Sequence, residues 1–179
     1  MTRLLPEQTR ATPSPLQRFN TLSAAEARHA LLSCLRSLRW ADRITAHRPY
    51  PDLDALLAAA DEAAYDLTPS DLAEALAAET LPTLPENTYG AAHMALSAAR
   101  AAYEARFGHA FVICLDDTPA SETLDRTLEE IRSRLANDPE EERVLAAEEL
   151  RRLAKGRLVS MLRGAGNCAI SPKQPAPGR

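Results

Sequence analysis

Apolar residues recur with a period of about 3.6 positions along most of this chain, most regularly between residues 139 and 163. The positions close to one helical face in that stretch are Val144, Ala147, Leu150, Ala154, Leu158 and Met161. Acidic residues Glu140 to Glu142 stand in the first turn, where carboxylates stabilise the helix dipole. The pattern predicts a long amphipathic helix whose apolar face packs on a core.

Residues that favour helix ends divide the remaining pattern into segments. Ser23 and Glu26 have the spacing of a capping box, Thr68 and Asp138 each precede a proline, and Gly108 follows a helical run as a C-cap would. We therefore expect helices at about 24–36, 38–47, 53–66, 69–80, 86–107, 119–136 and 139–163.

One short segment, residues 110–115, is rich in residues that favour extended backbone and is bounded by Gly108 and Asp116. We expect it to be a buried extended stretch between two long helices. Residues 1–14 and 164–179 lack periodicity and are predicted to be disordered tails, which leaves one domain at 15–163.

Composition supports a single all-α domain with several helices. Alanine and leucine supply most of the 45% hydrophobic residues, whereas aromatic residues make up only 4%. A formal net charge of -4 argues against nucleic acid or an anionic membrane as a partner, because both require concentrated positive charge. A small molecule or a protein is the expected partner.

The residues that commonly bind metals or form disulfides are scattered. Cys34, Cys114 and Cys168 have no metal-type spacing, and their odd number without a signal peptide predicts free thiols and a cytoplasmic location. The four histidines are far apart, so we expect no metal site. Phosphate-binding loops, the nucleophile elbow and zinc-protease motifs are also absent from the sequence.

Several separate motifs nevertheless occur in a characteristic order. They are Phe19-Asn20-x-Leu22-Ser23, Trp40, Arg48-Pro49-Tyr50, Tyr103-x-x-Arg106-Phe107-Gly108-x-x-Phe111-Val112-Ile113, Arg134-Leu135, Glu142 and Arg157-Leu158. In this combination the chain resembles the 2-oxo-4-hydroxy-4-carboxy-5-ureidoimidazoline (OHCU) decarboxylase family over roughly residues 16–162. The resemblance implies an all-helical fold, usually a homodimer, that needs no cofactor and forms (S)-allantoin in urate breakdown. Trp40 and Arg48-Pro49-Tyr50 are interpreted as residues that specify this fold.

The same resemblance implies a catalytic apparatus that this sequence lacks. The family uses the histidine of a His-Pro pair and the glutamate of a Glu-Gln pair for proton transfer, but Glu79-Thr80 stands at the His-Pro position. Either Glu79 or His109 is a candidate catalytic replacement; the alternatives are a solvated carboxylate and a packed histidine. Glu86 is a candidate remnant of the Glu-Gln pair, or simply a helix cap.

The resemblance also implies where a substrate binds. Backbone groups of the extended segment, at Phe111, Val112, Ile113 and Cys114, hold the ureido and ring amides, with Glu86 beside them. Arg157 is a candidate for binding the substrate carboxylate bidentately, or for a salt bridge with Glu142 or Glu148.

Two functions from different classes remain open. The first is a divergent, cofactor-free decarboxylase acting on a small heterocyclic acid of the urate-to-allantoin type, or a repurposed relative of it. The second is a catalytically inactive homologue that serves as a small-molecule-binding or protein-interaction module.

Overall fold

Helices form most of the structure, a computed structural model that describes residues 13–80 and 90–164. Within these ranges there are eight helices and no strand. They are α1 (Pro15–Thr21), α2 (Ala24–Leu32), α3 (Leu38–Ala46), α4 (Leu53–Tyr65), α5 (Pro69–Ala77), α6 (Gly90–Phe107), α7 (Thr123–Arg134) and α8 (Pro139–Gly164). The predicted all-α class is confirmed, and none of these described helices is long and apolar enough to span a membrane.

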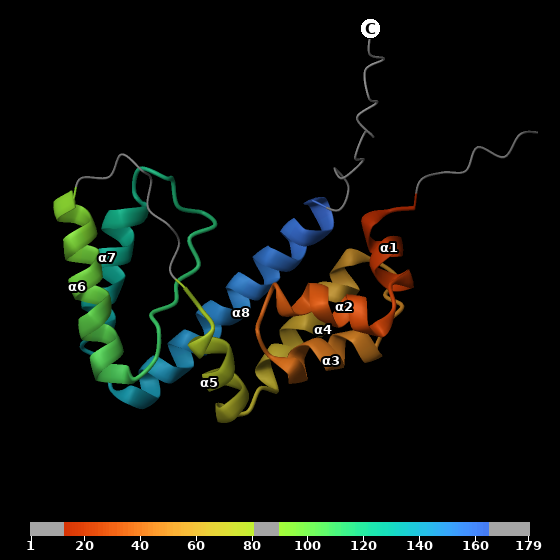
Figure 1. Cartoon of the computed structure of the whole chain (residues 1–179), viewed down its shortest axis with the longest axis horizontal. Coiled ribbons are helices and arrows are strands. Elements are labelled where there is room, and N and C mark those ends of the chain that lie inside the picture. The colour runs from red at the N-terminus through yellow and green to blue at the C-terminus, as the bar shows by residue number, and fades with distance from the viewer. Residues whose placement is uncertain (1–12, 81–89, 165–179) are drawn as a thin grey trace, which may run out of the picture.

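The long helix α8 connects two groups of helices. Figure 1 shows α6 and α7 beside its N-terminal end, and α1 to α4 on the other side of the molecule along its C-terminal half. Its buried residues fall at every fourth position: Glu142, Ala146, Leu150, Ala154, Leu158 and Leu162. Four residues turn an α-helix by about 400°, so this buried stripe rotates by about 40° at each step. The rotation lets α8 pack against different partners at its two ends.

This winding stripe corrects the single apolar face predicted from periodicity. Leu150, Ala154 and Leu158 are buried as expected, but Val144 is 62% exposed. Ala146 and Leu162 are buried instead, together with the charged side chain of Glu142. A period-3.6 template misses such a stripe because it assumes that the helix faces one core along its whole length.

The extended segment after α6 separates two hydrophobic clusters. Phe111 and Ile113 pack with Leu96, Tyr103 and Ile131 between α6 and α7, whereas Val112 belongs to the larger cluster between α8 and the N-terminal helices. Successive side chains of extended backbone point in opposite directions, so one short segment contributes to both clusters. The predicted buried extended stretch is confirmed, and Figure 1 shows it running between the α6 and α7 pair and α8.

Several predicted helix ends are confirmed by their hydrogen bonds. Ser23 and Glu26 form the expected capping box, Thr68 caps α5, and the Asp138 side chain accepts from the first backbone N–H groups of α8. Gly108 has a φ of 76° after α6, a conformation that glycine adopts without steric cost.

Other predicted boundaries were wrong. Helix α1 was missed, although Ser14 and Gln17 form a capping box with a proline at the first position. Helix α7 begins at Thr123 and not near 119, because the N–H of Glu122 closes a tight turn onto the carbonyl of Pro119. Helix α2 ends at Leu32 and not near 36, since the next N–H groups bond three residues back. The predicted start of α6 at 86 lies outside the described residues.

The motif residues interpreted as fold-specifying hold the N-terminal helices together. The Trp40 indole donates to the carbonyl of Ala60 at 3.0 Å, and it is fully buried. Arg48 donates to the carbonyls of Phe19 and Leu22, both at 2.8 Å. The contacts of Arg48 satisfy carbonyls at the C-terminal end of α1, and the contact of Trp40 fixes α3 against the middle of α4, which confirms the structural interpretation.

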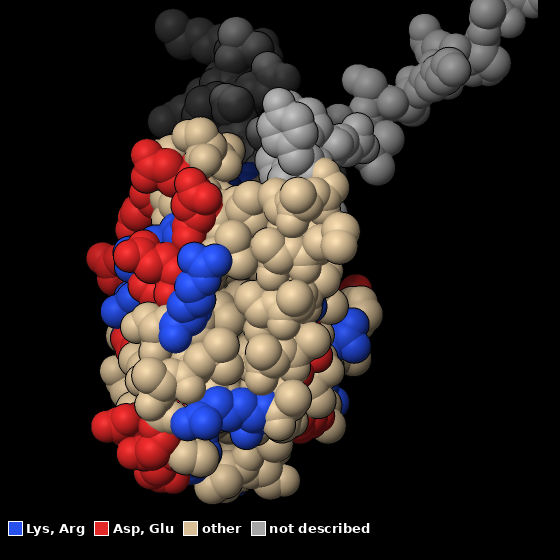
Figure 2. Space-filling model, turned by 90° about the vertical axis from the view of Figure 1, so that its left-hand side faces the viewer, with Lys and Arg blue, Asp and Glu red and all other residues tan. Residues whose placement is uncertain are grey.

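Charge on the end of the molecule formed by α6 and α7 is unevenly distributed. Figure 2 shows a broad uncharged area there, flanked on one side by intermingled acidic and basic side chains. Half of the exposed residues of α6 are alanine, and Met94 is 74% exposed. This face carries no continuous basic surface.

Glu142 and Arg134 form a buried ion pair between α8 and α7. Arg134 donates from Nε to Glu142 at 2.8 Å and from Nη1 to the carbonyl of Val112 at 2.8 Å. The hydroxyl of Tyr103 also donates to Glu142, and the amide of Asn137 donates to its second oxygen at 2.9 Å. Burial, followed by the hydrogen bond to Glu142, raises the pKa of Tyr103 well above its usual range. The network ties α6, α7, α8 and the extended segment together.

We predict that Arg134→Met destabilises the protein by about 3–5 kcal/mol, because it leaves the Glu142 charge buried without its partner. The double variant Arg134→Met/Glu142→Leu should be more stable than this single variant, since it removes both charges. Urea denaturation followed by circular dichroism measures both. The matched control is Arg126→Met, which breaks an exposed pair with Glu130 and should cost less than about 1 kcal/mol. Equal losses in the two single variants would contradict the prediction.

Candidate functional site

Two residues that the sequence suggested separately, Glu79 and Arg157, form a bidentate ion pair. Glu79 follows the end of α5, where its N–H bonds to the carbonyl of Leu76, and Arg157 projects from α8. Nη1 and Nη2 of Arg157 each donate to one carboxylate oxygen of Glu79, both at 2.8 Å. The Glu79 side chain is only 7% exposed, so this carboxylate is not a solvated surface group.

The guanidinium of Arg157 also makes a hydrogen bond to the backbone of another part of the chain. Its Nη1 donates to the carbonyl of Cys34 at 3.1 Å, at the end of the α2 region. The hydrogen bond with Glu79 is the main reason that the pKa of Arg157 lies above its usual range. The salt-bridge partners considered from sequence were wrong, because Glu142 pairs with Arg134 and Glu148 pairs with Arg151. The geometry is the one with which arginine binds a ligand carboxylate, but here the carboxylate belongs to the protein.

The extended segment supplies two backbone groups that already have side-chain partners. The carbonyl of Val112 accepts from Arg134, and the N–H of Cys114 donates to Glu149 at 2.6 Å. The side chains of Phe111, Val112 and Ile113 are buried, so only their backbone faces are candidates for ligand contact. Sequence reasoning missed Glu149, because nothing local to α8 indicates that it reaches a segment 35 residues earlier.

A polar hollow of about 600 Å³ lies between the turn after the extended segment and the C-terminal half of α8. Cys114, Asp116, Arg152, Lys155 and Arg163 contribute to its lining. The turn approaches α8 closely at Gly156, where a Cβ atom would meet Asp116 Oδ2 at 2.4 Å. The lining carries three cationic side chains, Arg152, Lys155 and Arg163, and two carboxylates, Asp116 and Asp117. The hollow lies at the end of the extended segment and beside the helix position of Arg157.

The other two candidate residues are placed differently. His109 packs its ring edge-on against Tyr103 at 5.5 Å between centroids, and its Nδ1 lies 3.0 Å from the carbonyl of Ala110. Among the described residues, no interaction joins His109 to Glu79 or Arg157, so the structure does not bring the two suggested catalytic residues together. Glu86 lies outside the described residues.

The thiols in the described ranges are free. Cys34 is buried and Cys114 is partly buried, and burial is the main cause that raises the pKa of each. Thiols of this kind are poor nucleophiles. The described residues also contain no group of histidine, cysteine, aspartate or glutamate side chains that could hold a metal ion.

These features define an all-helical domain in which an arginine of the last helix lies near a buried extended segment. The family model of OHCU decarboxylase matches residues 20–88 and 83–159. The chain therefore belongs to the OHCU decarboxylase family, as the sequence motifs indicated. The two matches overlap at residues 83–88, after α5 and before α6 in the sequence.

Solved structures support the same fold. The crystal structure of (S)-allantoin synthase matches with a TM-score of 0.67 and 18% identity, over 83% of this chain and 54% of that chain. The present chain thus spans about half the length of that protein. A crystal structure of OHCU decarboxylase in the presence of (S)-allantoin matches with a TM-score of 0.63 and 21% identity, over 74% of this chain and 96% of that chain. No curated protein sequence matches the chain significantly.

We predict that a double-mutant cycle with Glu79→Gln and Arg157→Met gives a coupling free energy of about 1–2 kcal/mol. The value is modest because the Arg157 side chain is 37% exposed, so water screens the pair. Urea denaturation of the four proteins measures the coupling. Arg28 and Asp42, whose side chains are 46% and 50% exposed, provide a control pair. A coupling no larger than that of the control would show that the pair is not an organised part of the site.

Proposed function

We propose that this protein is a divergent member of its family that binds a small carboxylated heterocycle of the urate-to-allantoin type without a cofactor. The proposed site comprises Arg157, Glu79 and the backbone of residues 111–114. We further propose that it decarboxylates OHCU weakly or not at all. The observation that carries this proposal is the bidentate ion pair between Glu79 and Arg157, at the position where the family has its catalytic histidine.

The physical reason lies in the proton that the reaction requires. When CO2 leaves, its electron pair remains on the ring, and a positioned acid must deliver a proton to complete the product. Both carboxylate oxygens of Glu79 accept N–H groups of the Arg157 guanidinium, so neither oxygen is free to deliver a proton to a ligand. His109 packs against Tyr103 in the other cluster.

The same ion pair favours a second function, a small-molecule-binding module without turnover. Arg157 is neutralised by Glu79, so a ligand carboxylate must compete for it with a group that is always present. This competition sets the affinity for a carboxylated ligand and supplies no proton donor, which a binding module does not need. The homodimer that the family resemblance implies stays a prediction.

We expect the purified protein to convert OHCU to (S)-allantoin no faster, or only slightly faster, than the spontaneous reaction. General acid or base groups contribute about 10²–10⁴-fold, so their absence should be evident. Circular dichroism at wavelengths sensitive to allantoin follows the stereoselective product. The variant Glu79→His/Thr80→Pro rebuilds the His-Pro pair and should gain activity. Robust (S)-allantoin formation by the unmodified protein would overturn the proposed loss of activity.

We expect Glu79→Gln to strengthen the binding of a carboxylated heterocycle by about tenfold, because it releases the charge of Arg157 for the ligand. Isothermal titration calorimetry with orotate and uracil isolates this effect, since the two rings differ by the carboxylate. Uracil affinity should not change. If Glu79→Gln left orotate affinity unchanged, or if Arg157→Met did not weaken orotate binding to that variant, the proposed ligand site would be wrong.

A further inference from the structure

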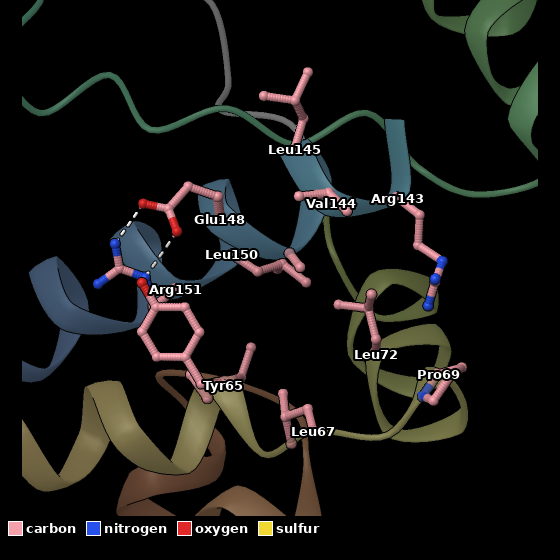
Figure 3. A pocket seen from close by; sticks show the side chains of 13 residues that line it. Tyr65, Leu67, Pro69, Leu72, Arg143, Val144, Leu145, Glu148, Leu150 and Arg151 are labelled. Carbon is pink, nitrogen blue, oxygen red and sulfur yellow. Dashed lines mark hydrogen bonds and ion pairs between the residues drawn. The ribbon is translucent and has the colours of Figure 1, made fainter. Parts of the chain in front are cut away.

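A second hollow lies between the N-terminal half of α8 and the turn that joins α4 to α5, with a volume of about 360 Å³. None of the residues that line it belongs to the site at Glu79, Arg157 and the extended segment. In Figure 3, Tyr65 and Leu67 lie on one side of this hollow, and Leu150 and Val144 on the other. The volume falls in the range of about 300–1,000 Å³ that is usual for small-molecule pockets.

The floor of the hollow belongs to the protein core. Leu35, Leu72 and Leu150, from three separate parts of the chain, are all buried and contribute to the lining. Tyr65 and Val144 stand at its rim and are 69% and 62% exposed, although both are large and largely apolar. A concave floor of core residues, with exposed apolar residues at its rim, offers a ligand contacts on several sides.

The charged groups at the rim are neutralised by other residues of the same chain. Arg151 pairs with Glu148 and with Asp61, the latter at 2.9 Å, and its guanidinium lies 5.0 Å from the Tyr65 ring centroid. Figure 3 shows the contacts between Arg151 and Glu148 beside this ring. Arg143 pairs with Glu140. The described lining therefore leaves no unpaired positive charge for an anion.

We propose that this hollow binds a neutral, largely apolar small molecule with an aromatic or branched body and at most one hydrogen-bonding group. The apolar floor stabilises such a body by removing it from water. The Tyr65 hydroxyl has no hydrogen-bond partner among the described residues and can serve the single polar group. A charged ligand would lose its hydration without gaining an unpaired counter-charge.

Two fluorescent probes that share one apolar body test the charge preference. N-phenyl-1-naphthylamine is neutral, whereas 8-anilinonaphthalene-1-sulfonate adds a sulfonate to the same rings. Fluorescence titration of the full chain should show the neutral probe binding at least about tenfold more tightly, because desolvating the sulfonate is costly. Equal affinities, or no binding of the neutral probe at its solubility limit, would overturn the proposal.

A pair of matched substitutions locates the binding. Ala147→Phe fills the hollow from α8, whereas Ala58→Phe places the same side chain on an exposed position of α4. The first variant should lose most of the binding of the neutral probe and the second should retain it, with helical circular dichroism confirming that both fold. Retained binding in Ala147→Phe would place the probe elsewhere and refute the assignment.

Two further measurements distinguish this hollow from the Arg157 site and from a contact between copies of the chain. Excess orotate should not displace the neutral probe, because the two proposed sites share no residue; displacement would overturn the second site and leave the first intact. Sedimentation over the same protein concentrations should show that probe binding does not depend on self-association. If probe binding falls as the chain self-associates, this face is an interface between copies, and the small-molecule assignment is wrong.

Discussion

The charge of Glu142 can be buried completely only because three side chains direct hydrogen-bond donors at its oxygens. Arg134 supplies the opposite charge, and Tyr103 and Asn137 supply further donors. These residues come from α6, α7 and the turn before α8, so no two of these elements can shift without exposing or unpairing the carboxylate. An unpaired buried charge costs several kcal/mol, which is comparable to the whole stability of a domain. The arrangement of α6, α7 and α8 thus depends on this network.

The network also positions the extended segment. Arg134 donates to the carbonyl of Val112 with a nitrogen that Glu142 does not use. Glu149, on the next part of α8, then accepts from the N–H of Cys114. The segment has no neighbouring strand in the described structure, so side chains replace the ladder partners that its backbone requires. A ligand at this segment can therefore contact only the backbone N–H and C=O groups that Arg134 and Glu149 do not use.

The buried network and the proposed ligand site use different residues of this chain. Tyr103, Arg134 and Glu142 form the buried network, whereas Glu79-Thr80 stands where the resemblance places the family's His-Pro pair. Arg157 keeps its place on α8 but binds Glu79 of the same chain. Glu79 and Thr80 take no part in the Glu142 network, so the interactions that hold α6, α7 and α8 together do not depend on them.

The sequence by itself determined the helical class, several helix caps, the buried extended segment and the family, because each depends on local propensity or on short motifs. It did not determine the winding stripe of α8, since periodicity assumes one partner face. It suggested Glu79 and Arg157 as candidates but not as partners, because 78 positions separate them and only the tertiary structure brings the guanidinium to the carboxylate. The sequence also did not indicate Glu149 as a partner of Cys114, because 35 positions separate the two residues. Which charges meet, and which are left for a ligand, was decided by packing between elements that are distant along the chain.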